Sequence, residues 1–215
     1  MLLLAAIVGI VALIFFSISK TLNPTSTTNN ALKEFDCSQF MELDKHFPNQ
    51  DHKLFKSLKT GVEASANGEP PEPTVFSLFS TDEDFLQKVM REVVKITMQC
   101  INQSEDPIEL TKDHLGDKLI ENYKQELVNR NIMIIKNVNE ADPSTLPSLH
   151  SICDTENPLV PKSIIFLTMK VPKSPTGKPV EYLTNHLERR WRDLDDNVRG
   201  PLITRMTDQT FFLKP

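Results

Sequence analysis

One arginine near the end of the chain differs in its setting from the other arginines. Arg205 lies within the mostly apolar stretch Leu202–Met206 (LITRM), so its guanidinium would emerge from a packed surface. A guanidinium is permanently charged and offers phosphate oxygens a planar fork that lysine cannot reproduce. We take Arg205 as a candidate functional residue, with support of packing as the alternative. The other arginines of this third of the chain are expected on solvated helix faces: Arg189, Arg190, Arg192 and Arg199.

A second pair of reactive residue types is His150 and Cys153, whose spacing places them on one face of a helix. A cysteine beside a histidine can act as a nucleophile, but no third group that would orient the histidine stands nearby. Two ligands do not make a zinc site. We therefore expect a structural pair. The chain also contains neither GxSxG nor HExxH, the usual signatures of serine hydrolases and zinc proteases.

Nucleotide chemistry lacks its usual residues. The phosphate-binding pattern GxxxxGK[ST] does not occur, and Gly177-Lys178 is followed by proline, so Lys178 is interpreted as a loop residue. The loop after the first expected strand, Ser80–Asp84 (STDED), is acidic and suits a helix N-terminus better than a phosphate. A later strand is followed by Lys136 and Asn137, where ATPases carry the acids that hold magnesium. We expect no cofactor, no metal and no ATP hydrolysis by this chain itself.

Strand and helix patterns alternate over most of the sequence. Apolar and β-branched runs predict strands at 74–79, 107–110, 131–138 and 163–171, with a possible edge strand at 211–213. Spaced apolar residues predict helices at 83–100, from Thr111 to about 130, at 146–153, at 180–191 and at 197–207. Two further helices, 31–47 and 51–66, are separated by Pro48. The alternation predicts a doubly wound α/β fold with a mostly parallel sheet and helices on both faces.

The first residues have the composition of a membrane anchor. Residues 1–18 (MLLLAAIVGIVALIFFSI) carry no charged side chain, and a helix of this length just spans a hydrocarbon core of about 30 Å. We expect a transmembrane anchor at 1–19, a polar tether at 20–30 and one domain at 31–215; a cleaved signal peptide is the alternative. Lys20 is the only charged side chain close to the segment, so the positive-inside rule leaves the orientation open.

Overall composition narrows the class of partner. Lys and Arg total 24 against 29 Asp and Glu, which argues against nucleic acid. The three cysteines, Cys37, Cys100 and Cys153, permit at most one intramolecular disulfide and are too scattered for a zinc site. Asn102-Gln103-Ser104 is a glycosylation sequon, which makes Asn102 a candidate site if the domain lies in the secretory lumen.

Taken in order, these features resemble the torsin-interacting protein family, which includes the lamina-associated polypeptide. The resemblance covers the chain from about Phe47 to its end. Its stretches are Phe47–Gln50 (FPNQ), TVFSLF with the helix after it, 131–147, Cys153–Asn157 (CDTEN) before SIIFLTMKV, and Arg205 in its apolar frame. Each stretch is weak alone, but their order is specific.

The resemblance implies a degenerate AAA+-like luminal domain that binds no nucleotide and pairs with torsin, an ATPase of the endoplasmic reticulum and nuclear envelope lumen. It implies a single-pass membrane protein whose domain activates torsin by placing an arginine finger in the partner's ATP site, within a ring-like hetero-oligomer. By position that arginine is Arg205. The implied role is that of an ATPase activator and not of an enzyme.

Two departures from the family pattern stand out. Family members pair a cysteine at the position of Cys153 with one near the C-terminus, whereas this chain ends Phe212-Leu213-Lys214-Pro215. The family's redox-active bridge is therefore not expected here. The large nucleoplasmic or cytoplasmic segment of the family is also not seen before the anchor. Two alternatives to activation stay open: a luminal tethering module that binds a partner without activating it, and an α/β enzyme using His150 and Cys153.

Overall fold

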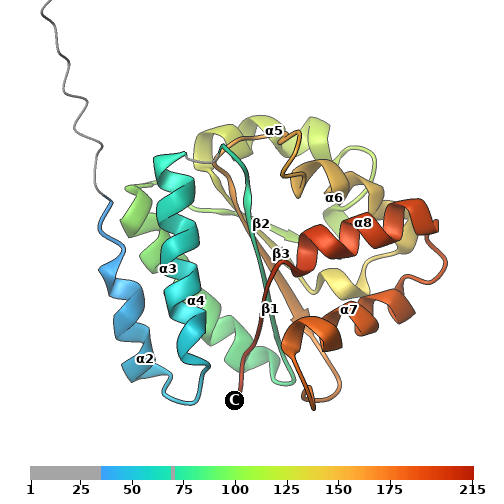
Figure 1. Cartoon of the computed structure of the whole chain (residues 1–215). Coiled ribbons are helices and arrows are strands. Elements are labelled where there is room, and N and C mark those ends of the chain that lie inside the picture. Colours follow the sequence, from blue (N-terminus) through green and yellow to red (C-terminus); the bar gives the residue numbers. More distant parts are fainter. Residues whose placement is uncertain (1–34, 69–70) are drawn as a thin grey trace, which may run out of the picture. The chain divides into compact units, whose positions relative to one another are not determined.

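Five parallel strands form the centre of the structure (Figure 1). The computed structural model describes residues 35–68 and 71–215, and its compact unit is Phe35–Pro215. The strands are β1 (Thr74–Ser80), β2 (Ile108–Thr111), β3 (Ile132–Lys136), β4 (Ile164–Lys170) and β5 (Gln209–Phe212). Their spatial order is β2-β3-β4-β1-β5, so β1 lies inside the sheet and β5 at its edge. The predicted parallel α/β sheet is confirmed.

The inner strands are apolar on both sides because both faces of the sheet are covered. Along β1, Val75 and Phe79 belong to one hydrophobic cluster, whereas Phe76 and Leu78 belong to the other. This alternation follows from the two-residue period of a strand. It leaves no solvent-facing side on β1, and the residues from Val75 to Ser80 are all buried.

The helices divide between the two faces. One face carries η1 (Ser38–Glu42), α2 (Leu43–His46), α3 (His52–Asn67) and α4 (Glu83–Ile101). The other carries α5 (Leu119–Arg130), α6 (Pro147–Ile152), α7 (Pro179–Arg190) and α8 (Asp196–Thr207), with the short helices η2 (Lys112–His114), η3 (Val138–Glu140) and η4 (Pro143–Thr145) in the connections. Figure 1 shows α3 and α4 on one side of the sheet and α6, α7 and α8 on the other.

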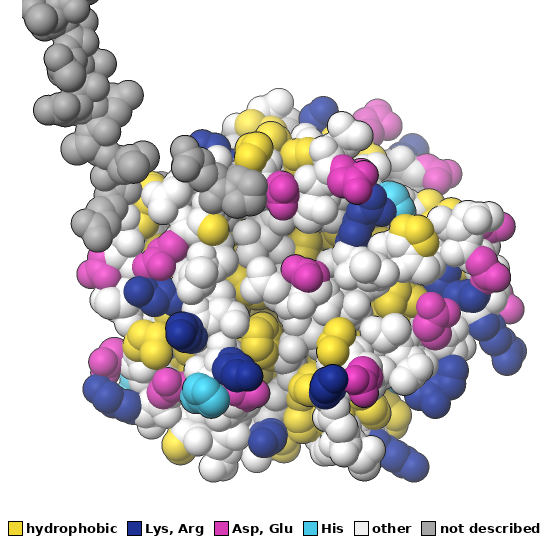
Figure 2. Space-filling model, viewed as in Figure 1, with side chains coloured by type: hydrophobic (Ala, Val, Ile, Leu, Met, Phe, Trp, Pro, Cys, Tyr) yellow, Lys and Arg dark blue, Asp and Glu magenta, His cyan; other side chains and the backbone are white. Residues whose placement is uncertain are grey.

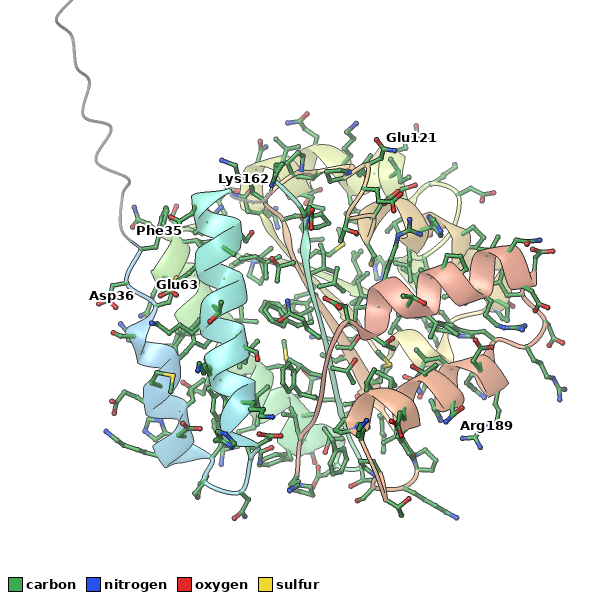
Figure 3. The ribbon with its side chains drawn as sticks, viewed as in Figure 1. Phe35, Asp36, Glu63, Glu121, Lys162 and Arg189 are labelled. Carbon is green, nitrogen blue, oxygen red and sulfur yellow. A yellow bond between two sulfur atoms is a disulfide. The ribbon has the colours of Figure 1, made fainter. Side chains whose placement is uncertain are left out.

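Helix α3 lies very close to β1. Its Gly61 has no Cβ, and a Cβ built there would lie 2.6 Å from Cζ of Phe76 and 3.0 Å from Cγ2 of Thr74. The Asp51 side chain caps the helix start by accepting from the N–H of Lys53. Near the other end, the Ser65 hydroxyl donates to the carbonyl of Lys162, which Figure 3 labels beside the end of α3. These contacts fix the position of α3 against the N-terminal part of β1.

The predicted helix from Thr111 is partly wrong. The segment forms only η2 and then breaks, because Gly116 has φ +133°, a conformation outside the helical region. Helix α5 starts at Leu119, so Leu115 does not belong to it. The edge strand begins two residues and ends one residue earlier than predicted, at Gln209–Phe212.

The predicted anchor at 1–19, the tether at 20–30 and the first residues of the predicted helix 31–47 lie outside the described residues. Within the described part of the chain, no helix is both long and apolar enough to cross a membrane.

One disulfide joins Cys37 to Cys100, with the two Cα atoms 4.9 Å apart. It ties the residue just before η1 to the C-terminal end of α4. Cys153 is the free cysteine and is buried.

Candidate arginine site

Helix α8 carries Arg205 on a turn that is held firmly to the sheet. The Asp195 side chain caps the helix by accepting from the N–H of Asn197, and Leu202, Ile203 and Met206 are buried against the core. The Ser77 hydroxyl of β1 donates to the carbonyl of Met206 at 2.5 Å. This bond fixes the backbone next to Arg205, whose side chain is 18% exposed.

The guanidinium of Arg205 contacts two side chains from the α6 region. Its Nη1 lies 2.6 Å from Nε2 of His150, and its Nη2 donates to Oδ1 of Asp154 at 3.2 Å. Arginine has five N–H donors and accepts none, so Nε2 of His150 is the acceptor in this contact. The Nε–H of Arg205 has no hydrogen-bond partner among the described residues.

Asp154 is itself held by the turn that follows α6. Its Oδ1 accepts from the backbone N–H groups of Glu156, at 3.0 Å, and Asn157, at 3.3 Å. Partial burial raises the pKa of this carboxyl, but the two backbone hydrogen bonds and the charge of Arg205 together outweigh that effect. The pKa of Asp154 therefore lies below its ordinary value, and the carboxylate stays ionised beside the guanidinium.

Cys153 lies in the core beneath this turn. Burial raises the pKa of its thiol to about 12, against the opposing effect of the Arg205 charge. A nucleophilic cysteine needs its thiolate, so this environment disfavours the alternative in which Cys153 attacks a substrate. His150 contacts Arg205, whereas Cys153 packs in the hydrophobic core. The two residues that sequence spacing placed together therefore have different environments.

Arg205 borders a groove of about 790 Å³ between α3, the start of β1 and the end of α8. The residues around it that carry charge or hydrogen-bonding groups include Lys53, Lys56, Thr60, Thr155, Arg205 and Asp208. Figure 2 shows basic, acidic and histidine side chains close together on the surface over α6 and α8. The contribution of α3 was missed by sequence reasoning, because nothing local in the sequence of α3 signals its nearness to α8.

The other arginines of this region differ from one another. Arg189 is exposed and projects from α7 (Figure 3), and Arg192 is also exposed, as expected. Arg190 donates from Nε to the carbonyl of Asn139 at 3.2 Å. The prediction that Arg199 lies on a solvated face is wrong, since its side chain is only 17% exposed and binds Glu188 and Asp196.

The carboxyl ends of β1 and β3 form a separate region, where a nucleotide would be expected in an ATPase of doubly wound topology. Only residues 81 and 82 separate β1 from α4, and the Asp82 side chain accepts from the N–H of Phe85, as the predicted helix cap requires. Lys136 binds Glu109 at 2.5 Å, and the side-chain amide of Asn137 donates to Glu83 at 2.8 Å. These side chains are engaged within the chain.

Asn102, the candidate glycosylation residue, is exposed at the C-terminal end of α4. It has φ 58°, a left-handed conformation that asparagine tolerates well. Its surroundings leave the side chain accessible.

Comparison with known structures identifies the fold. A closed-state reconstruction of Hsp104 with ATPγS and FITC casein matches 88% of this chain and 37% of that chain, with a TM-score of 0.59 and 11% identity. The S. cerevisiae Hsp104–ADP complex matches 82% of this chain and 29% of that chain, with a TM-score of 0.54 and 14% identity. The chain therefore has an AAA+-like α/β fold, and at these identities the likeness extends to the fold alone.

Sequence comparison gives a distant relative. Replicase polyprotein 1ab of Alphamesonivirus 1 is 23% identical over 203 residues, which cover 87% of this chain. The chain spans 4% of the length of that polyprotein. No family model matches the chain.

Proposed function

We propose that this chain is a non-catalytic partner of a torsin AAA+ ATPase and activates ATP hydrolysis by supplying Arg205 in trans. The observation that carries the proposal is the setting of Arg205, which borders an open groove at the surface of an AAA+-like fold with its Nε–H free of partners among the described residues. AAA+ proteins assemble through neighbouring subunits of this fold, so a chain of the same shape suits a place beside an ATPase subunit in a hetero-oligomeric ring.

The chemistry of this role needs only a well-placed cation. Transfer of the γ-phosphoryl group to water spreads negative charge over its oxygens, and a guanidinium from a neighbouring subunit stabilises that charge. In other ATP- and GTP-hydrolysing systems such a finger raises the rate by about 10³ to 10⁵. Arg205 keeps N–H donors available beside the groove.

The proposal assigns the ATP to the partner and not to this chain. Support comes from the missing GxxxxGK[ST] pattern and from the two-residue connection between β1 and α4, which gives little backbone for cradling phosphates. Lys136 and Asn137, at the end of β3, are tied to Glu109 and Glu83. A magnesium-holding acid is therefore not offered at that strand end.

We further propose a location in the endoplasmic reticulum and nuclear envelope membrane, with residues 1–19 as the single anchor and the domain in the lumen. The Cys37–Cys100 disulfide fits an oxidising compartment. Exposed Asn102 offers a direct test, since a luminal domain would carry a glycan there. Endoglycosidase should increase the mobility of the cellular protein, and Asn102→Gln should abolish that shift; a domain that protease digests from the cytosolic side contradicts the location.

The activity is tested by measuring torsin ATP turnover with the full chain in detergent micelles. Wild-type chain should raise the rate, and Arg205→Ala should bind with similar affinity but stimulate at least about 100-fold less. Arg192→Ala is the matched control, because it removes an arginine whose side chain is 81% exposed and which does not line the groove. Equal stimulation by wild type and Arg205→Ala, at equal binding, contradicts the role of Arg205.

A second candidate is a tethering module that binds its partner without activating it. It is favoured by one observation: Arg205 already has a carboxylate partner, Asp154, within its own chain. In that case the full chain binds the ATPase at saturation while turnover stays at its basal rate. The binding and turnover measurements together separate the two functions.

A further inference from the structure

The geometry around Arg205 points to two positioning residues, and we infer that Asp154 and His150 hold its guanidinium ready for a partner's phosphate. This inference rests on the proposed function, because the phosphate belongs to the partner ATPase. Neither residue would contact the phosphate itself. Both would act by restricting where Arg205 points.

Asp154 is held rigidly by the turn that contains it. Asp154 follows the buried Cys153 directly, and its Oδ1 is fixed by the N–H groups of Glu156 and Asn157 in the same turn. The position of the Asp154 carboxylate is therefore fixed by hydrogen bonds to the backbone of its own turn. From that position it accepts from Nη2 of Arg205 at 3.2 Å.

Arg205 is held from one side only, that of α6. Nη1 of Arg205 donates to Nε2 of His150 at 2.6 Å, and Nη2 donates to Oδ1 of Asp154. Both terminal nitrogens are therefore contacted from the α6 side. Each of these nitrogens carries two N–H groups, and only one of each is needed for its contact. The remaining donors, including the Nε–H, stay available at a residue that borders the groove.

Holding the guanidinium in place before the reaction has an energetic advantage. An arginine side chain has many rotamers, and ordering it during the reaction would cost conformational entropy. Donors that are already placed avoid this cost in the transition state, which is how preorganised groups accelerate reactions. The pair should therefore affect the rate at saturating partner more than it affects binding.

The test uses the full chain and has one readout that needs no partner. Phenylglyoxal modifies arginine, and peptide mass spectrometry reports the rate at each site. In Asp154→Asn and in His150→Phe, Arg205 should react at least about threefold faster than in wild type, because a contact that orders and shields it is lost. Arg192, with a side chain 81% exposed, is the internal control and should react at an unchanged rate.

Asp142→Asn is the matched control variant. Asp142 makes a similar turn, accepting from the N–H of Ser144 at 2.8 Å, but its hydrogen bonds lie within its own turn and do not involve Arg205. It should change neither the reactivity of Arg205 nor the stimulation of the ATPase. His150→Phe leaves the Asp154 turn in place, so it keeps the test valid if Asp154→Asn fails to fold.

Stimulated turnover supplies the second readout. Both variants should lower the maximal stimulated rate by about tenfold, equivalent to about 1.4 kcal/mol, while the concentration for half-maximal stimulation stays within about twofold. An unchanged reaction of Arg205 with phenylglyoxal in both folded variants overturns the positioning role. Faster modification in a chain whose wild type stimulates no torsin instead retains the positioning geometry and rejects the proposed function.

Discussion

The two halves of α8 each carry a part-buried arginine, and the two residues are held very differently. Arg199 is 17% exposed and Arg205 is 18% exposed, so burial does not distinguish them. Arg199 donates from Nε to Glu188, from Nη1 to the carbonyls of Arg192 and Leu194, and from Nη2 to Asp196. Arg205 is held only through its terminal nitrogens, by His150 and Asp154.

The exposed fraction alone is therefore a poor guide to the role of an arginine. All three nitrogens of Arg199 are bonded, and together they join α7, the connecting loop and the start of α8, which is the pattern of a structural residue. Arg205 borders the groove and retains an unbonded Nε–H within the described structure.

The largest expected effect concerns Cys153, which is buried in the core beneath the turn that carries Asp154. With the pKa of Cys153 raised from 9.0 to about 12, iodoacetamide at pH 9 should label it about three orders of magnitude more slowly in the folded chain than in urea. Because folding keeps the thiol protonated, stability should also fall as pH rises from about 9 toward 12. Unreduced protein and mass spectrometry make the measurement specific, since the other two cysteines form the disulfide. Equal labelling of the folded and the unfolded chain would show that Cys153 is accessible to solvent in the folded chain.

Arg199 should matter most for stability. Arg199→Ala leaves the carbonyls of Arg192 and Leu194 without their donor and removes the partner of Glu188, so we expect a loss of about 2 to 3 kcal/mol in unfolding free energy. Arg205→Ala should cost less, about 1 to 2 kcal/mol, since fewer of its donors are engaged. Urea unfolding followed by circular dichroism measures both. The reverse ranking would remove the structural distinction between the two arginines.

Gly61 tests the opposite wall of the groove. Gly61→Ala should lower the unfolding free energy by about 1 to 2 kcal/mol, because the added methyl group meets Phe76 of β1 and overpacking outweighs the gain in helix propensity. Thr60→Ala, at the exposed neighbouring position of α3, is the control and should change stability by less than about 0.5 kcal/mol. A stabilised Gly61→Ala variant would mean that α3 lies farther from β1 than the structure shows, and that the groove is correspondingly wider.

Most of the scaffold could be predicted from the sequence because its signals are local. The apolar runs of β1, β3 and β4 and the acidic cap Asp82 reflect chain periodicity and helix capping, both of which act within a few residues. The break at Gly116 was missed because the regular spacing of Leu115 with Leu119 masked a single glycine in a non-helical conformation.

The surroundings of the candidate site were much less predictable. Arg205 could be selected from its residue type and apolar neighbours, but His150 and Asp154 lie 55 and 51 residues away in sequence. The engaged state of Arg199 depends on α7 packing beside α8, and the groove depends on α3 approaching β1. Such contacts depend on how the helices and strands pack in three dimensions, so no short sequence pattern predicts them.

The proposed role of Arg205 is tested most directly by torsin ATP hydrolysis at saturating full chain, comparing wild type with Arg205→Lys. Lysine keeps the positive charge but lacks the planar fork, so we predict unchanged binding and a stimulated rate at least about tenfold lower. Full stimulation by Arg205→Lys, with equal binding, would contradict the claim that the guanidinium of Arg205 acts on the partner's phosphate.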